Sequence, residues 1–380
     1  MKHSPRVLVL AGEASGEMHA AALVRDIARI DPSISFVGIG GCEMAAAGVE
    51  LLGHCEEIGV VGGVEGLHSL PEVLKTYKRV KRLLASGEVD LFIPVDYPGM
   101  NLRLACHAHK CGIPVCYYIS PQVWAWRERR IKTIARCVDR MMVILPFEEA
   151  IYRKAGIDAH YVGHPLLDSV RPTLKREEFR KRCGIPRESL LVTLMPGSRP
   201  KEVGYNLPVM LRAAGLISRE VPDAQFALAL APTLKPSQVG VYLSKPGTPP
   251  VRIFKGDTYS LIGASDGALV ASGTATLEVA LLGIPMVVVY RVHPSTYEIG
   301  KRLVRVRWLS LVNNVLQEGA VPEFIQHAAT PEEVSRGLLR RIEMVEESRE
   351  LAQRLKGVLS PPEGFRRASE LVLEMLREAR

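Results

Sequence analysis

The sequence has little of what marks secreted, membrane-spanning or disordered proteins. Its seven cysteines follow no framework over 380 residues, which argues against a disulfide-stapled secreted fold and for a reducing compartment. No apolar run approaches the roughly 20 residues that a membrane span needs. The N-terminus leads straight into a strand-like run, so we expect no signal peptide. Hydrophobic residues at 47% and charged residues at 24% are ordinary globular values, which excludes disorder, collagen and coiled coil.

The motifs of two common nucleotide sites are also missing. The sequence contains no Asp-x-Asp pair, so the usual carboxylate clamp for a metal-bound nucleotide diphosphate is absent. No Gly-x-Gly-x-x-Gly follows the first strand-like run, which disfavours a dinucleotide. The histidines have no metal-ligand spacing. Cys106, Cys111 and Cys116 stand five apart, unlike a zinc knuckle, so we expect them to be small buried apolar groups. We therefore expect no metal and no cofactor.

The sequence does carry a modest net charge of +8 with histidine neutral, which suits an anionic substrate or an anionic lipid surface. In one segment, apolar side chains loosened by glycines run into five cations. The apolar members are Val60, Leu67, Leu70 and Leu74, and the cations are Lys75, Lys78, Arg79, Lys81 and Arg82. Two interpretations stay open. The segment meets a membrane surface or acyl chains, or it is a core-facing helix with a solvated basic face.

Short apolar runs alternate with amphipathic stretches along the whole chain. In the first half these runs cover residues 6–11, 35–39, 89–95, 113–119, 141–145 and 160–162. In the second half they cover residues 190–194, 225–230, 251–254, 267–270 and 285–290. Apolar strands that do not alternate in polarity and are spaced by helices predict parallel sheets covered on both faces.

A polar stretch at residues 171–189 divides the chain. We predict an α/β protein made of two doubly wound, Rossmann-like domains that face each other across a cleft. The N-terminal domain is expected at residues 1–170 and the C-terminal domain at residues 190–355. Residues 356–380 are expected to form a packing helix, with a return to the N-terminal domain left open.

In the first half, three loops follow predicted strands, where open parallel sheets bind ligands. The small residues of GEASGE (12–17) let backbone approach a ligand, and the alternative is a plain tight turn. Asp96 can act as a general base towards a substrate hydroxyl, with Asn101 positioning that hydroxyl, or it forms a turn. Trp124, Trp126 and Arg127 form either a sugar platform or mere packing.

Two loops in the second half suit phosphate. Gly197 gives backbone access, and Arg199 offers a planar fork for phosphate oxygens, unless it is simply a loop arginine in water. The segment 272–278 (SGTATLE) begins a helix whose free amides and hydroxyls form an anion site. Glu278, one turn later, can accept two ribose hydroxyls, and the alternative is a capping arrangement with a solvent-exposed glutamate.

Seven stretches together resemble the lipid-A-disaccharide synthase family, glycosyltransferases of lipopolysaccharide biosynthesis. They are GEASGE (12–17), VDYPGMNLRLA (95–105), YYISPQVWAWR (117–127), LPFE (145–148), YVGHP (161–165), MPGSR (195–199) and ASGTATLE (271–278). The resemblance runs from about residue 7 to residue 326. YISPQVWAWR and ASGTATLE in this order are highly specific, whereas PGSR alone is weak.

The resemblance implies an inverting enzyme that transfers 2,3-diacylglucosamine from its UDP donor to the 6′-hydroxyl of 2,3-diacylglucosamine 1-phosphate (lipid X). The products are a β-1,6-linked disaccharide 1-phosphate and UDP. It also implies a metal-independent, two-domain fold of the GT-B type with the nucleotide in the C-terminal domain. The expected partners are the two lipid substrates and the membrane, with the enzyme in the cytoplasm, peripheral on the inner face of the inner membrane. No nucleic acid is expected, and a homodimer stays open.

The resemblance also assigns roles to residues. The catalytic pair is Asp96 and Arg199. The UDP-sugar site comprises Gly16, Gly197, Ser198, Arg199, Ser272, Gly273, Thr274, Ala275, Glu278, Asn313 and Gln326. The acceptor side comprises Ser15, Asn101, Trp124 and Arg127.

The sequence departs from the family pattern in three places. Gly99 stands where the family usually has Asp, which puts in doubt a second carboxylate beside Asp96 but leaves Asp96 itself untouched. Glu17 ends the segment that in the family ends in Asp. Only Leu311, Asn313 and Leu316 match the family's LPNLLAG-like segment cleanly.

Three rival functions stay open on the residues. A UDP-N-acetylglucosamine 2-epimerase-like isomerase on the same fold would need no acyl-chain surface. A dinucleotide oxidoreductase is disfavoured by the missing glycine fingerprint. A non-catalytic membrane-binding protein would leave the paired phosphate loops unexplained.

Overall fold

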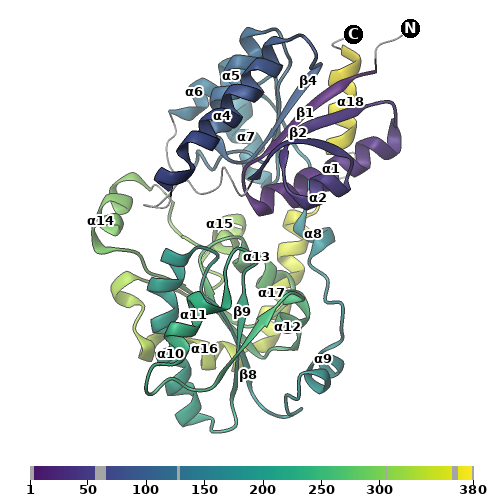
Figure 1. The fold of residues 1–380 in the computed structure, drawn as a ribbon. Coiled ribbons are helices and arrows are strands. Elements are labelled where there is room, and N and C mark those ends of the chain that lie inside the picture. Colours follow the sequence, from purple (N-terminus) through teal and green to yellow (C-terminus); the bar gives the residue numbers. More distant parts are fainter. Residues whose placement is uncertain (1–3, 56–65, 126–128, 305, 362–366, 379–380) are drawn as a thin grey trace. The chain divides into compact units, whose positions relative to one another are not determined.

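A computed structural model of the chain describes residues 4–55, 66–125, 129–304, 306–361 and 367–378. Its contacts divide the chain into two units, the first with residues 1–165 and 361–380 and the second with residues 166–360 (Figure 1). The second unit therefore begins before residue 190, the start expected from the sequence. Two short helices, α8 (Leu166–Ser169) and α9 (Arg176–Arg182), belong to it.

The first unit is built on a seven-stranded sheet in the order β3-β2-β1-β4-β5-β6-β7, with every neighbouring pair parallel. The strands are β1 (Arg6–Ala11), β2 (Ser35–Gly40), β3 (Val49–His54), β4 (Leu91–Val95), β5 (Cys116–Tyr118), β6 (Arg140–Val143) and β7 (Asp158–Tyr161). The helices are α1 (Ala14–Ile30), α2 (Cys42–Ala46), α4 (Gly66–Ala85), α5 (Pro98–Lys110), α6 (Arg130–Cys137), α7 (Pro146–Lys154) and α18 (Ala368–Glu378).

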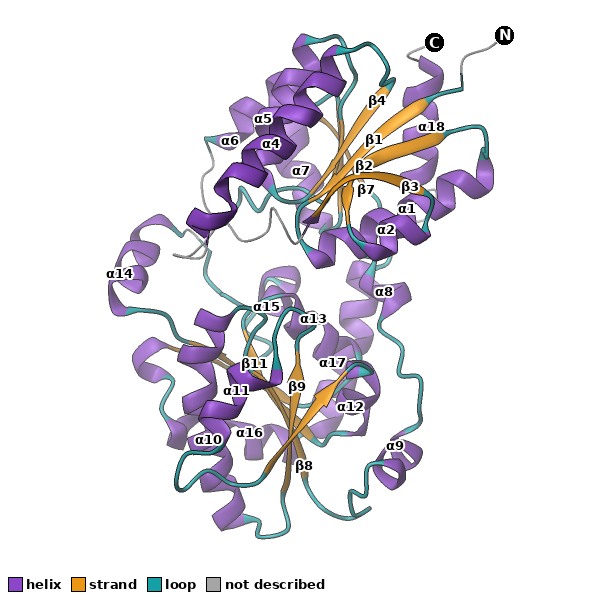
Figure 2. Cartoon of the chain, in the orientation of Figure 1, coloured by secondary structure: helices purple, strands orange, loops and turns teal. Residues whose placement is uncertain are grey.

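Helices cover both faces of this sheet (Figure 2). Leu8 and Leu10 of β1 pack with buried residues of α4, α5, α6 and α7 on one face. Val7 and Val9 pack with buried residues of α1 and α18 on the other. Because successive side chains of a strand point to opposite faces, a central strand covered on both sides must be apolar throughout. This explains the unbroken apolar run of β1.

The second unit holds a six-stranded parallel sheet in the order β10-β9-β8-β11-β12-β13. Its strands are β8 (Leu191–Met195), β9 (Gln225–Leu230), β10 (Val251–Lys255), β11 (Gly267–Ala271), β12 (Met286–Tyr290) and β13 (Glu323–Ile325). Its further helices are α10 (Pro200–Glu220), α11 (Pro236–Leu243), α12 (Thr258–Ala264), α13 (Thr274–Leu281), α14 (Pro294–Leu303), α15 (Leu311–Leu316), α16 (Pro331–Glu343) and α17 (Val345–Leu359), with a 3-10 turn η1 (Gln326–Ala328).

The two sheets repeat one topology. In each, the chain winds outward through three strands, then crosses back to the other side of the first strand and winds outward the other way. The direction reverses between β1 and β4 in the first unit and between β8 and β11 in the second. The predicted doubly wound α/β class is thereby confirmed. In such sheets ligands bind beyond the carboxyl ends of the strands at this reversal.

Two strands and two cysteines differ from the expectations. The sequence analysis missed β3 and β13, edge strands whose residues are mostly only partly buried and so lack a continuous apolar signal. Cys106 forms a disulfide with Cys137, linking α5 to α6, and Cys111 is exposed. The expectation of buried apolar groups is thus wrong for Cys106 and Cys111. It is right for Cys116, where burial raises the pKa to about 12.

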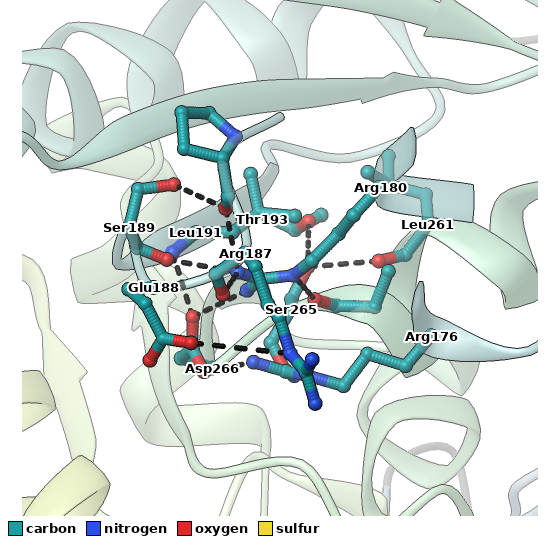
Figure 3. Close-up of polar contacts among 12 residues, drawn as sticks. Arg176, Arg180, Arg187, Glu188, Ser189, Leu191, Thr193, Leu261, Ser265 and Asp266 are labelled. Atoms are coloured by element: carbon teal, nitrogen blue, oxygen red, sulfur yellow. Dashed lines mark hydrogen bonds and ion pairs between the residues drawn. The ribbon is translucent and has the colours of Figure 1, made fainter. Parts of the chain in front are cut away.

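A buried arginine ties the start of the second unit to its sheet (Figure 3). Arg180 of α9 is 2% exposed, and its guanidinium donates hydrogen bonds to backbone carbonyls and to one carboxylate. The acceptors are the carbonyls of Ala264 (2.9 Å), Arg187 (2.8 Å) and Ser189 (2.9 Å) and the carboxylate of Asp266 (2.7 Å). A buried charge is tolerated because all these groups face it.

Asp266 is the second half of this cluster. Its carboxylate also accepts the amide of Leu191 at 2.8 Å, at the start of β8, and it pairs with Arg176 of α9. The cluster therefore holds α9 against the amino ends of the two central strands β8 and β11. This edge is opposite the carboxyl ends of the strands.

We predict that Arg180→Met lowers the free energy of unfolding by about 3–5 kcal/mol, because it removes the buried charge partner of Asp266 and the side-chain donor of several carbonyls. Arg187→Met is the matched control, since the Arg187 side chain is 77% exposed and pairs with Glu177 at the surface. Exposed pairs of this kind contribute at most about 1 kcal/mol. Urea unfolding followed by circular dichroism measures both. Equal losses in the two variants would show that the cluster does not hold the unit together.

Candidate active site

The backbone beyond β4 and β5 is in an unusual conformation. Five described residues other than glycine have positive φ angles, and three of them lie here: Asp96 and Tyr97 at +45° and Ile119 at +60°. Each such residue costs on the order of 1–3 kcal/mol, and strain of this kind gathers at functional sites. The surrounding structure must therefore hold these turns in place.

Two buried side chains hold the Asp96 turn. The Asn101 amide nitrogen donates to the backbone carbonyls of Asp96 at 2.7 Å and Val95 at 3.1 Å. The Tyr117 hydroxyl donates to the same Asp96 carbonyl at 2.6 Å. Asn101 is fully buried, and its Oδ1 has no hydrogen-bond partner among the described residues. The structure thus uses the nitrogen of Asn101 to brace the predicted general base.

The space around Gly12 and Gly99 shows which of these two positions requires a glycine. A Cβ at residue 12 would lie 2.3 Å from the Tyr97 ring, so the end of β1 requires Gly12. A Cβ at residue 99 would meet nothing within 4 Å. The backbone around residue 99 would therefore leave room for the Cβ of the family's usual aspartate. Gly99 removes a carboxylate from this turn, and steric crowding does not require the glycine. Burial and the charge of Glu13 raise the pKa of Tyr97.

Residues 14–17 of the GEASGE motif form the first turn of α1, and Gly12 and Glu13 precede the helix. Gly16 is buried, and an added Cβ would meet only ordinary contacts at 3.8 Å or more. Ser15 lies in the same turn, and its side chain is outside the described part. Glu17 is buried and accepts the amide of Glu43 at 2.9 Å, so it caps α2. The Glu17 carboxylate thus has a structural partner, the Glu43 amide of α2, within the first unit.

Beyond β5, Trp124 is half-buried, and its indole nitrogen donates to Glu148 of α7 at 2.9 Å. The indole ring packs edge-on against Phe147 at a centroid distance of 5.0 Å. Trp124 is therefore held in a defined orientation by two residues of α7. Arg127, the other aromatic-loop residue predicted for the acceptor, lies outside the described residues, as does Trp126.

In the second unit, the loop after β8 already binds a carboxylate. The Ser198 amide donates to Glu202 at 3.1 Å and the Arg199 guanidinium to the same carboxylate at 3.3 Å. Gly197 has a φ of +121°, and a Cβ there would lie 2.7 Å from Glu202. The Arg199 side chain is 64% exposed. The predicted phosphate loop thus presents an amide and a guanidinium to one negative group at the start of α10.

The loop after β11 lies next to the loop after β8 in strand order, at the carboxyl ends of the second sheet. Gly273 precedes α13, which begins at Thr274, and the Ser272 hydroxyl donates to the carbonyl of Leu309 at 2.7 Å. Ala275 continues the first turn. Glu278 lies one turn further, where burial raises its pKa and the Tyr259 hydroxyl donates to it at 3.4 Å. Tyr259 is a neighbour of Glu278 that the sequence did not reveal.

Asn313 and Gln326 are buried, and their amides bind backbone of the same unit. Asn313 donates to the carbonyl of Val321 and the carboxylate of Glu323 and accepts the amide of Val321, all at 2.8–2.9 Å. Gln326 donates to the carbonyl of Val292 at 2.8 Å and accepts its amide at 3.1 Å. Both side chains therefore shape the loops around the predicted UDP-sugar site.

Sequence reasoning missed Asn206 of α10, a buried link between two loops of this edge. Its amide nitrogen donates to the carbonyl of Pro196 at 3.1 Å, and its oxygen accepts the amide of Arg291 at 2.8 Å. It joins the loop after β8 to the loop after β12. A polar residue on the buried face of an otherwise apolar helix was the only available signal.

The basic segment forms α4, whose described inner face packs on the core. Val73, Val80 and Leu84 contact the core, whereas Leu74 is 48% exposed. All five cations are exposed, and Lys78, Lys81 and Arg82 line a surface depression of about 260 Å³. Val60 and the side chains of Leu67 and Leu70 lie outside the described part. No described helix is long and apolar enough to cross a membrane.

Within the described residues, no three His, Cys, Asp or Glu side chains gather where they could hold a metal ion. Among the predicted site residues, the charged side chains at the two carboxyl edges are Asp96 in the first unit and Arg199 and Glu278 in the second. The arrangement offers a proton acceptor on one sheet and an anion-binding loop on the other.

Solved structures of other proteins share this two-domain fold. Among solved structures, UDP-GlcNAc 2-epimerase from Neisseria meningitidis bound to UDP-GlcNAc matches with a TM-score of 0.66 at 12% identity, covering 98% of this chain and 100% of that one. MurG from Acinetobacter baumannii matches with a TM-score of 0.53 at 15% identity, covering 98% and 99%. At such identities the likeness shows the fold alone, which these GT-B proteins share.

Sequence relatives are far closer. Lipid-A-disaccharide synthase from Syntrophus aciditrophicus is 42% identical over 380 residues, covering 99% of each chain. The enzyme of that name from Geobacter metallireducens is 42% identical over 378 residues, covering 99% of this chain and 98% of the relative. The family model described as lipid-A-disaccharide synthetase matches residues 7–360. The resemblance seen in the sequence is confirmed, and the chain belongs to the lipid-A-disaccharide synthase family of glycosyltransferases.

Proposed function

We propose that this chain transfers 2,3-diacylglucosamine from UDP-2,3-diacylglucosamine to the 6′-hydroxyl of 2,3-diacylglucosamine 1-phosphate. The products are the β-1,6-linked disaccharide 1-phosphate and UDP. Family membership supports the reaction class. The observation that carries the mechanism is the Asp96 turn, which lies at the strand-order reversal of the first sheet and is braced from beneath by Asn101 and Tyr117.

In this mechanism the Asp96 carboxylate accepts the proton of the acceptor's primary hydroxyl. The hydroxyl oxygen forms a bond to the anomeric carbon as the bond from that carbon to the UDP oxygen breaks, and UDP keeps the electron pair. Attack comes from the face opposite UDP, so an α-linked donor gives a β-linked product. General base catalysis of this kind contributes roughly 10²–10⁴-fold to the rate.

The second unit would hold the leaving group. As UDP departs, negative charge builds on the diphosphate, and fixed donors aimed at developing charge are the main catalytic term in such sites. Ser198 and Arg199 already bind the carboxylate of Glu202, which supports their binding a phosphate in its place. The amides at the start of α13 are the second set of donors, and Glu278 is placed to accept ribose hydroxyls.

We further propose that the enzyme binds the inner face of the cytoplasmic membrane through the exposed cations of α4. Their side chains point away from the core that Val80 and Leu84 join, and each cation near an anionic lipid surface contributes about 1 kcal/mol. The acyl chains of both substrates require such a location. A homodimer is compatible with this placement, and no nucleic acid takes part.

Asp96→Asn should cut turnover by roughly 10²-fold or more while leaving UDP affinity and the unfolding transition unchanged, because it removes only the proton acceptor. Disaccharide formation under saturating substrates measures turnover, and calorimetry measures UDP affinity. Asp90→Asn is the matched control, since Asp90 lies just before the amino end of β4 and accepts the amide of Arg6. Near-normal turnover in Asp96→Asn would eliminate the general base.

Replacing Lys75, Lys78, Arg79, Lys81 and Arg82 with Gln should weaken binding to anionic vesicles and use of the acylated acceptor. UDP affinity should hold, because the nucleotide is assigned to the other unit. Vesicle flotation at low and high salt measures the binding. The control replaces five exposed cations of α16 and α17, Arg336, Arg340, Arg349, Arg354 and Lys356, with Gln. If both variants float like the wild type, α4 is not a membrane surface.

A further inference from the structure

Glu148 is a buried carboxyl group at the carboxyl edge of the first sheet. It is the third residue of α7 and only 2% exposed. Its Oε2 accepts the amide of Leu145 at 3.3 Å, the bond expected of a glutamate in a capping box. A capping glutamate needs no burial, however, and an isolated buried carboxylate is costly. We therefore expect the second carboxylate oxygen, Oε1, to have a hydrogen-bond donor as well.

That oxygen holds Trp124. Oε1 accepts the indole N–H at 2.9 Å, while Phe147, the residue before Glu148, packs edge-on against the indole ring. One more bond joins α7 to the same segment, because the Tyr152 hydroxyl donates to the carbonyl of Pro121 at 2.8 Å. The first two turns of α7 thus fix the start of the segment 121–125 and the orientation of its tryptophan.

The Glu148 carboxyl group is shaped mainly by burial, and the negative charge of Asp96 also acts on it. Burial raises the pKa of Glu148 to about 7, the hydrogen bond from Trp124 lowers it, and the negative charge of Asp96 raises it. Tyr152 is the other titratable group that faces Glu148, and burial raises its pKa strongly. The Glu148 carboxyl group is therefore harder to ionise than an exposed glutamate, and its hydrogen bond from Trp124 favours the ionised form.

We propose that Glu148 is a positioning residue for the acceptor: through its hydrogen bond to Trp124 it orients the indole that supports the acceptor sugar beside Asp96. This inference rests on the proposed function, which assigns the acceptor to the Asp96 side. Glu148 does not touch the substrate. It acts through Trp124, and its contribution therefore lies in acceptor binding and not in the chemical step.

Two substitutions separate this role from helix capping. Glu148→Gln keeps an oxygen for the Trp124 N–H but loses the bond to the Leu145 amide, where the new NH₂ group faces a donor. Glu148→Leu loses both bonds at similar volume. If Trp124 is what matters, Glu148→Leu should raise the KM for the acceptor roughly tenfold, the cost of one strong hydrogen bond. The kcat and the KM for the UDP-sugar should change little, and Glu148→Gln should stay near the wild type.

Trp124→Phe removes the same hydrogen bond from the other side while Glu148 and its bond to the Leu145 amide stay in place, and it keeps the test sharp if Glu148→Leu folds poorly. It should raise the acceptor KM by a similar factor, and combining it with Glu148→Leu should add nothing further. Glu148→Gln behaving like Glu148→Leu would reduce Glu148 to a helix cap and overturn the proposal. Additive effects of Trp124→Phe and Glu148→Leu would overturn it as well.

A spectroscopic measurement separates this inference from the reaction itself. In a Trp126→Phe, Trp308→Phe background Trp124 is the only tryptophan, and its emission should shift with a midpoint near pH 7 as Glu148 ionises. The shift should vanish in the same background with Glu148→Gln. A shift together with no transferase activity would refute the proposed function and leave the contact standing. Emission that is the same in the Glu148 protein and in its Glu148→Leu variant at every pH would overturn the contact.

Discussion

Both halves of this protein depend on one topological constraint. Parallel strands linked by helical crossovers bring all their carboxyl ends to the same edge of a sheet, and the connections diverge where the strand order reverses. Here the reversal falls between β1 and β4 and between β8 and β11. Asp96 and Arg199 lie in the loops that leave β4 and β8, and Glu278 lies in α13, the helix that follows β11. The strand order alone therefore brings Asp96 and the Arg199 loop to the carboxyl ends of the strands at the two reversals.

Buried polar side chains fix the conformation of these loops by hydrogen bonds to their backbone. Asn101 and Tyr117 both donate to the Asp96 carbonyl, and so stabilise a turn that two consecutive positive φ angles would otherwise make unfavourable. Asn206 joins the loops after β8 and β12, and Gln326 clamps Val292 beside them. Fixed donors and acceptors are useful in catalysis because they need no reorganisation during the reaction. The cluster of Arg180 and Asp266 performs a similar task at the opposite edge.

The sequence predicted what depends on local pattern and on strand ends. Unbroken apolar runs identified the central strands, and polar residues just after them identified Asp96 and Arg199. Glu148 and Asn206 escaped notice because their partners Trp124 and Arg291 lie 24 and 85 residues away in the sequence. The hydrogen bonds that Asn313 and Gln326 make to neighbouring loops could not be predicted either, since only the folded chain shows which polar groups lie together.

The most direct test of the account is a reaction in EDTA with purified protein, UDP-2,3-diacylglucosamine and 2,3-diacylglucosamine 1-phosphate. Mass spectrometry detects the product, and the anomeric proton coupling reports its configuration. The account predicts a β-linked disaccharide 1-phosphate with one UDP released for each disaccharide formed. An epimerised UDP-sugar without disaccharide, an α-linked product, or activity that appears only when a divalent metal is restored would contradict it.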